Sequence, residues 1–254
     1  MKKLLAITAL SAALFFGQTA AAEEKAAEEV KPSHVEMVLV LDESGSMSDL
    51  TRDTIGGFNS MIEKEKKLDV DAHVTTVLFN DQYKMLYNRR ELKDVSKMTD
   101  KDYTPGGMTA LLDAVGRTIH KMDMVAGIHR KDKGNKVLFV IITDGEENDS
   151  KEYTYADVKK LIKDRQENAG WEFIFLGANI DAAAAAENLG IDRDRAVKYK
   201  NTGSGVRANF KAVAELSDSL AKSGRVSDEW KETVEKDEDD AADKQSAAVT
   251  LHRR

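Results

Sequence analysis

The chain has 254 residues, a formal net charge of −7 and no cysteine, and 41% of its residues are hydrophobic. This length and composition predict one globular domain with tails rather than a fibrous or wholly disordered protein. The lack of cysteine excludes disulfides, thiolate metal sites and a cysteine nucleophile.

The net charge is concentrated in one segment. Nine acidic and two basic residues lie between Asp228 and Asp243, so this stretch alone carries a charge of −7. Such a run is typical of a solvated chain, and we expect residues 224–254 to form an acidic, disordered tail. The remainder is neutral overall, so we expect no nucleic-acid partner and no long-range selection of a ligand by charge.

The N-terminus has the pattern of an export signal. Lys2 and Lys3 precede an apolar run over residues 4–16, and small residues follow up to Ala22. We therefore predict a signal peptide over residues 1–22 and an exported protein, periplasmic or secreted. The apolar run is shorter than the roughly 20 residues that span a bilayer, so we expect no stable membrane insertion after cleavage. A charged linker, residues 23–33, precedes the predicted domain at 34–223.

Strand and helix patterns alternate along this domain. Apolar runs predict buried strands at 35–41, 74–79, 137–142 and 173–176, with a weak last strand at 196–199. Residues 83–87 follow too closely for a helical crossover and predict an antiparallel edge strand. Helical spacing of apolar residues predicts helices at 55–62, 111–122, 155–162, 182–189 and 210–220. The pattern predicts a doubly wound, mostly parallel α/β sheet of Rossmann-like type, with helices on both faces.

In open sheets of this class, ligands bind outside the carboxyl ends of the strands. Three loops there carry carboxylates and hydroxyls, and the candidate ligands are Asp42, Ser44, Ser46, Thr109 and Asp144. An all-oxygen set suits a hard cation, Mg²⁺ first and then Mn²⁺ or Ca²⁺. Each loop taken alone is more typical of a helix cap or a plain turn. Their joint placement at strand ends favours the metal site.

Three segments also carry a family resemblance. Asp42-Glu43-Ser44-Gly45-Ser46, Gly106-Gly107-Met108-Thr109-Ala110-Leu111 and Ile142-Thr143-Asp144-Gly145 resemble the metal-ion-dependent adhesion site (MIDAS) of von Willebrand factor type A (vWA) domains. The resemblance implies that Ser44, Ser46 and Thr109 bind the metal directly in at least one state. It implies that Asp42 and Asp144 hold the metal directly or through waters. It further implies a non-enzymatic module whose cation captures an Asp or Glu of a partner protein.

Two other functions are weighed against this one. Two aspartates and a cation would also suit a phosphatase or phosphotransferase of the haloacid-dehalogenase type, but that family needs a second Asp where Ser44 stands. It also needs a phosphate-clamping lysine, and the sequence assigns none. Nucleotide binding lacks a phosphate-binding loop, and Gly203-Ser204-Gly205 is interpreted as a helix entrance.

Some remaining residues receive simpler interpretations. Glu146, Glu147 and Asn148 are expected to form a solvated rim beside the metal site, and Asp181 to cap a helix. The five histidines show no ligand spacing and are interpreted as surface or core residues. Trp230, inside the acidic run, either packs on the domain or serves as a docking element.

Overall fold

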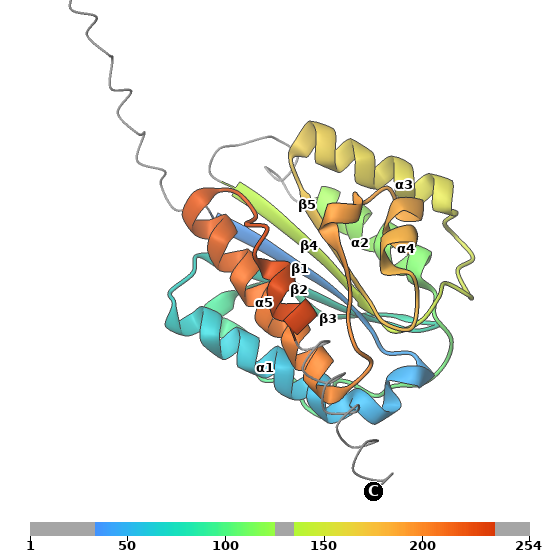
Figure 1. Cartoon of the computed structure of the whole chain (residues 1–254), viewed down its shortest axis with the longest axis horizontal. Helices are drawn as coiled ribbons and strands as arrows, with labels where there is room; N and C mark the ends of the chain where they lie inside the picture. The colour runs from blue at the N-terminus through green and yellow to red at the C-terminus, as the bar shows by residue number, and fades with distance from the viewer. Residues whose placement is uncertain (1–33, 125–134, 237–254) are drawn as a thin grey trace, which may run out of the picture.

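The computed structural model describes residues 34–124 and 135–236. They form one six-stranded sheet flanked by helices, in the strand order β3-β2-β1-β4-β5-β6 (Figure 1). The strands are β1 (His34–Asp42), β2 (Ala72–Phe79), β3 (Tyr83–Glu91), β4 (Asn135–Thr143), β5 (Glu172–Gly177) and β6 (Ala196–Lys198). All neighbouring pairs are parallel except β2 and β3, which confirms the predicted antiparallel edge strand.

Helices cover both faces of the sheet, as predicted. The helices α1 (Thr51–Lys67) and α5 (Gly203–Ser223) lie on one face. The opposite face is covered by α2 (Leu111–Asp123), α3 (Tyr155–Asp164) and α4 (Ala182–Leu189) (Figure 1). A 3₁₀ turn over Gly45–Leu50 leads from the loop after β1 into α1.

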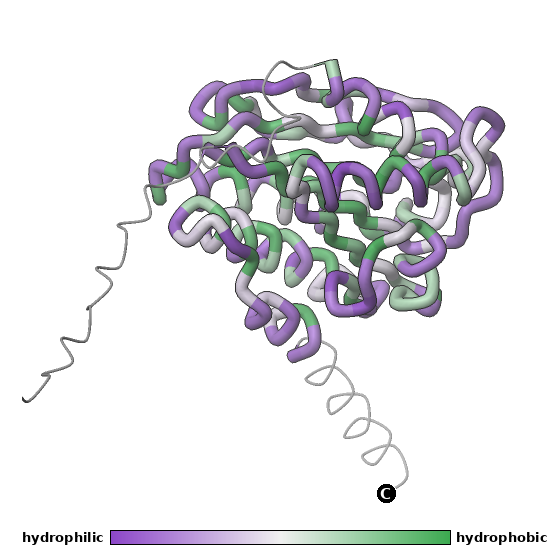
Figure 2. The backbone as a smooth tube through the Cα atoms, turned by 90° about the horizontal axis from the view of Figure 1, so that it is seen from above, coloured by the Kyte–Doolittle hydropathy of each residue, from purple (hydrophilic) through white to green (hydrophobic). Residues whose placement is uncertain are grey.

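The alternation of β1 explains this three-layer arrangement. Met37 and Leu39 enter the core beneath α1 and α5, whereas Val38 and Val40 enter the core beneath α2, α3 and α4. Successive strand residues point to opposite faces, so a strand that is apolar throughout must be covered on both. Figure 2 shows hydrophobic residues gathered in the interior, whereas hydrophobic and hydrophilic residues alternate along the outer helices.

The strand order places a topological switch point at the centre of the sheet. From β1 the chain passes through α1 to β2 on one side, and after β3 it returns through α2 to β4 on the other side of β1. The two crossovers lie on opposite faces, so the connections diverge at the carboxyl ends of β1 and β4. Ligand sites in doubly wound sheets form in this crevice.

Several helix ends follow from local chemistry. Thr154 and Asp157 form a capping box at the start of α3. Asp181 caps α4 by accepting a hydrogen bond from the Ala184 amide at 3.0 Å, as predicted. Thr202 caps α5, which begins at Gly203, so the Gly203-Ser204-Gly205 segment is a helix entrance.

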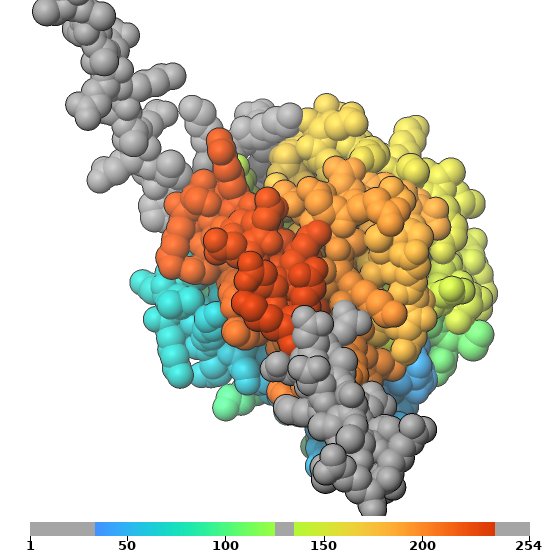
Figure 3. Space-filling model, in the orientation of Figure 1, coloured from blue at the N-terminus to red at the C-terminus, as the bar shows by residue number. Residues whose placement is uncertain are grey.

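The folded unit continues past the predicted domain end at residue 223. Residues 230–236 are helical, and Trp230 and Val234 are only 2% and 1% exposed in the core beneath α1 and α5. Figure 3 shows this last described segment packed on the body of the molecule. The start of the acidic run is therefore part of the folded unit, because its two apolar side chains complete that core.

The predicted signal peptide, the linker and the acidic residues beyond 236 lie outside the described residues. Among the helices that the structure does describe, none combines the length and apolarity needed to cross a membrane.

Candidate metal centre

Asp42 ends β1 and is 1% exposed at the switch point. Its two carboxylate oxygens accept separate hydrogen bonds, Oδ1 from the Ser44 amide at 2.7 Å and Oδ2 from the Thr143 hydroxyl at 2.6 Å. The Tyr103 hydroxyl donates to the Asp42 carbonyl at 2.6 Å. The Asp42 side chain is thus fixed in orientation by Ser44 and Thr143, while Tyr103 holds its backbone.

The next loop brings the two serines to the same place. Ser44 is buried and its Oγ lies 3.1 Å from the Oγ of Ser46, which in turn donates to Asp144 Oδ1 at 2.5 Å. Asp144 follows β4 directly and is 2% exposed. Four of the five predicted ligands therefore form one continuous cluster between the ends of β1 and β4.

Thr109 approaches this cluster from the loop before α2. It is 4% exposed, and its hydroxyl faces Gly145, lying 3.9 Å from the point where a side chain there would begin. Its backbone is clamped by Asn148, whose Oδ1 accepts from the Thr109 amide at 2.8 Å and whose amide donates to the Thr109 carbonyl at 3.0 Å. Within the described residues, its hydroxyl makes no hydrogen bond to the other four candidates.

Backbone contacts tie the three loops together. The Gly45 amide donates to the Gly107 carbonyl at 3.2 Å, and the Gly106 amide donates to the Glu43 carbonyl at 2.9 Å. Gly107 has a φ of +75°, in the left-handed region that favours glycine. The Gly-Gly pair therefore sets the path by which the chain delivers Thr109 to the switch point.

The oxygen cluster fits a hard cation. Neighbouring ligands around an octahedral Mg²⁺ with bonds near 2.1 Å lie about 3 Å apart. The distance of 3.1 Å between the Oγ atoms of Ser44 and Ser46 matches this spacing. The shorter hydrogen bond from Ser46 Oγ to Asp144 Oδ1 adds a carboxylate oxygen to the same cluster. Within the described chain, no lysine forms a hydrogen bond or an ion pair with Asp42 or Asp144.

Burial dominates the electrostatics of the cluster. Burial raises the pKa of Asp42, although hydrogen bonds from Ser44 and Thr143 lower it, and the nearby Asp144 charge raises it further. Burial and then the charges of Asp144 and Asp42 raise the pKa of Tyr199 well above its ordinary value. These carboxylates share a poorly solvated pocket, which is the setting in which a bound cation stabilises negative charge most effectively.

Sequence reasoning missed several supporting residues. Thr143 and Tyr103 orient Asp42, while the amides of Asn179 and Asn201 donate to the Asp144 carbonyl and carboxylate at 3.3 and 3.4 Å. For Thr143, the sequence offered one signal, which was a polar residue at the end of an otherwise apolar strand. The two asparagines lie on distant loops and carried no such signal.

Glu146 and Asn148 of the predicted solvated rim are exposed and Glu147 is half-buried, but two of the three residues also hold the backbone around the site. Glu147 accepts hydrogen bonds from the Leu112 amide at 3.0 Å and from the Ser150 amide at 2.7 Å, so it anchors the start of α2. Asn148 holds Thr109 through the two bonds described above. Only Glu146 is an exposed residue without such a structural contact in the described chain.

Two of the histidines interpreted as surface or core residues lie close together in the structure. His34 and His73 meet at Glu36, with their ligand-type atoms within 4.8 Å of one another. This group lies at the opposite end of β1 from Asp42.

Comparison with known proteins identifies the domain. Residues 34–191 match the family model vWA-TerF-like, described as the vWA domain found in the TerF C terminus. All five candidate ligands lie within this match. A comparison with curated proteins gives no significant match.

Solved structures share the fold at low sequence identity. The pilus adhesin SpaC from Lactobacillus rhamnosus GG, in an open conformation, has a TM-score of 0.59 and 14% identity over 76% of this chain and 31% of its own. The vWF domain of the type V pili tip protein Mfa5 from Porphyromonas gingivalis has a TM-score of 0.53 and 12% identity over 78% and 99%.

A third structure is described with a metal. Proximal thread matrix protein 1 from the mussel byssus, with a zinc-occupied MIDAS motif, has a TM-score of 0.50 and 13% identity over 73% of this chain and 46% of its own. This chain thus spans less than half of the matrix protein and of SpaC. These likenesses establish the fold.

Proposed function

This chain belongs to the family of vWA domains found in the TerF C terminus, and from that premise we propose that it is an exported, cation-dependent protein-binding module. Asp42, Ser44, Ser46, Thr109 and Asp144 would hold the cation, with Mg²⁺ as the first candidate and Mn²⁺ or Ca²⁺ next. The observation that carries the proposal is the continuous cluster of Asp42, Ser44, Ser46 and Asp144 at the switch point.

The chemistry of this donor set supports binding rather than hydrolysis. The hydroxyls of Ser44, Ser46 and Thr109 are neutral, so they leave much of the charge of a bound cation unbalanced. A cation in that state attracts a further carboxylate when one coordination position remains open to solvent. The exposure of Ser46 makes this side of the cluster the approach for an Asp or Glu of a partner protein.

Other features are consistent with this role. A pilus adhesin, a pili tip protein and a matrix protein with a zinc-occupied MIDAS motif are among the proteins that share the fold. The sequence pattern of residues 1–22 supports export. The position of Ser44 and the absence of a lysine partner on either aspartate in the described chain favour a non-enzymatic role over the phosphatase alternative.

The open coordination position is tested with Mn²⁺ as the probe. We expect full-length protein to bind Mn²⁺ and to raise the relaxation rate of water protons, because exchanging waters occupy the open position. Blocked glutamate (N-acetyl-glutamate amide) should lower that enhancement by displacing a water, whereas blocked glutamine should not. Equal effects of the two compounds would overturn carboxylate capture, and robust Mg²⁺-dependent turnover of a phosphate ester would overturn the non-enzymatic role.

A further inference from the structure

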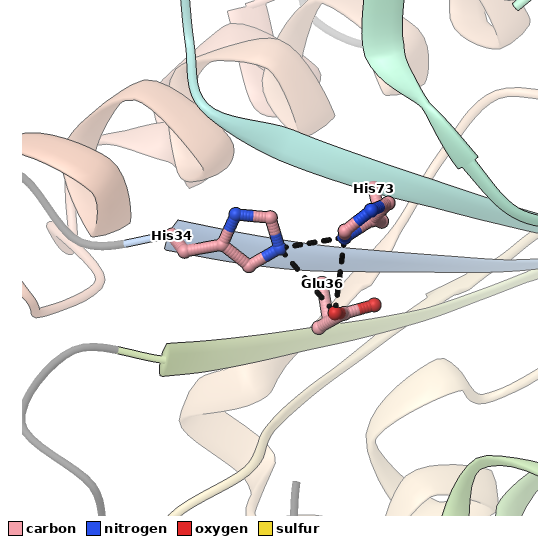
Figure 4. A group of neighbouring side chains, drawn as sticks. All are labelled: His34, Glu36 and His73. Carbon is pink, nitrogen blue, oxygen red and sulfur yellow. Dashed lines mark hydrogen bonds and ion pairs between the residues drawn. The ribbon is translucent and has the colours of Figure 1, made fainter. Parts of the chain in front are cut away.

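A second group of metal-ligand side chains lies at the amino-terminal edge of the sheet (Figure 4). His34 and Glu36 are two residues apart on β1 and so face the same side. His73 is the register partner of Glu36 on the parallel strand β2. Strand pairing alone therefore brings the three side chains together, across a sequence separation of 39 residues.

The three inward-pointing atoms form a nearly equilateral triangle. His34 Nε2 and His73 Nδ1 lie 2.8 Å apart, and each lies 3.3 Å from Glu36 Oε1 (Figure 4). Ligands around a tetrahedral Zn²⁺ with bonds of 2.0–2.1 Å lie about 3.3 Å apart. Two edges of the triangle therefore match one face of a zinc coordination shell, and the two imidazoles would need to move apart by about 0.5 Å to complete it.

Neighbouring residues hold the ligands in this orientation. Asp71 Oδ1 lies 2.9 Å from His34 Nδ1, which directs the other ring nitrogen, Nε2, toward the centre of the triangle. A carboxylate on the outer nitrogen of a histidine is the common support of a metal-bound imidazole. Arg89 Nε donates to Glu36 Oε2 at 3.0 Å, and its Nη2 contacts Oε1 and lies 3.3 Å from His73 Nδ1. A cation at the centre would displace Nη2 from both of these atoms and leave the bond from Nε to Oε2 in place.

An ion can reach this group from solvent. A hollow of about 470 Å³ opens beside it, lined in part by His34, Asp71 and His73. The side chains of His34 and His73 are 19% and 27% exposed, whereas that of Glu36 is 3% exposed. The two histidines thus face the entry path, and Glu36 forms the floor.

We propose that His34, Glu36 and His73 form a second cation site that prefers Zn²⁺ or another borderline divalent ion, with water as the fourth ligand. Imidazole nitrogens select such ions over Mg²⁺, which prefers an all-oxygen shell. The site is independent of the candidate centre at Asp42, because the nine residues of β1 separate the two by about 26 Å.

The test must remove the other centre, since Zn²⁺ also binds oxygen ligands. In full-length Asp42→Ala protein we expect one Zn²⁺ to bind by calorimetry, and Co²⁺ to give the strong visible absorption typical of four-coordinate sites. Adding His73→Gln should weaken Zn²⁺ binding by about 100-fold and remove the Co²⁺ band. Adding His120→Gln instead, which changes an exposed histidine of α2, should leave both signals unchanged.

Two results would overturn the proposal. One is the absence of saturable Zn²⁺ binding at millimolar concentration in the Asp42→Ala protein. The other is equal Zn²⁺ affinity in the His73→Gln and His120→Gln variants. If His73→Gln fails to fold, as judged by circular dichroism, His34→Gln at the first residue of β1 takes its place, with the same expected loss and the same contradicting result.

Discussion

The two ends of β1 carry two very different groups of polar side chains. At its carboxyl end, Asp42 joins a cluster of oxygens that come from loops and are held by backbone contacts. At its amino end, His34 and Glu36 join His73 in a group that is built by strand register and charge. The comparison shows that one strand can bring hydroxyls and carboxylates together at one edge of the sheet, and two imidazoles with a carboxylate at the other.

The two ends of β1 should therefore differ in which substitutions they tolerate. The residues at the carboxyl end lie on loops, so their positions depend on the backbone path, and a substitution at a glycine with a positive φ should disturb them. The residues at the amino end lie on paired strands and are held by ion pairs, so removing a charge should disturb them. Three substitutions test this contrast.

The largest effect is expected from Gly107→Ala in the loop that delivers Thr109. Alanine at a φ of +75° is strained, and its Cβ would contact the Asp81 carboxylate, so we expect a loss of about 2–3 kcal/mol in the free energy of unfolding. Gly106→Ala is the matched control, because no atom lies within 4 Å of its added Cβ. Urea unfolding measures both, and equal stabilities would contradict the special role of Gly107.

At the amino end, Glu36→Gln removes the charge that Arg89 and His34 share. Burial alone would raise the pKa of Glu36, but hydrogen bonds from His34 and Arg89 lower it to about 2. We expect the variant to lose about 2 kcal/mol at pH 7 in the presence of a chelator. Glu91→Gln, which changes an exposed residue of β3, is the control and should change stability little.

The pH dependence of that loss has a defined sign. A carboxyl whose pKa is 4.5 when unfolded and about 2 when folded stabilises the protein above pH 4.5, and this contribution disappears as the pH falls toward 2. The stability gap between wild type and Glu36→Gln should therefore shrink between pH 7 and pH 3. A gap that stays constant or widens as the solution is acidified would contradict the assignment.

The smallest effect is expected from Thr143→Val, which removes the hydroxyl that orients Asp42. Removing a group that orients a metal ligand should weaken Mg²⁺ binding roughly tenfold, about 1.4 kcal/mol. Thr76→Val is the control, because the buried Thr76 hydroxyl on β2 has no hydrogen-bond partner among the described residues. Calorimetry compares the two, and an unchanged affinity in Thr143→Val would show that Asp42 needs no such support.

Sequence patterns were sufficient to predict the sheet and to bring together the residues of the carboxyl-end cluster. The strands of this fold are apolar runs, and Asp42, Ser44 and Ser46 lie close together in the chain, so periodicity and local spacing indicated both. Thr143 was visible only as a polar residue at the end of a strand. The packing of Trp230 on the domain was one of two interpretations, because a single apolar residue within an acidic run gives no clear signal of burial.

The amino-end group could not be predicted from spacing. His34 and His73 meet only because Glu36 is in register with His73, and register depends on how whole strands pair. Arg89 reaches the same carboxylate from a bulged part of β3, where its own φ is +45°. Such irregularities arise from the packing of the complete sheet.

The most direct test of the central claim is Mg²⁺ calorimetry on three full-length proteins. Wild type and His73→Gln should each bind one Mg²⁺ with the same affinity, because the histidine group lies at the far end of β1. Asp42→Ala should lose at least 100-fold in affinity, because it removes the carboxylate at the centre of the switch-point cluster. Equal binding by wild type and Asp42→Ala would contradict the account.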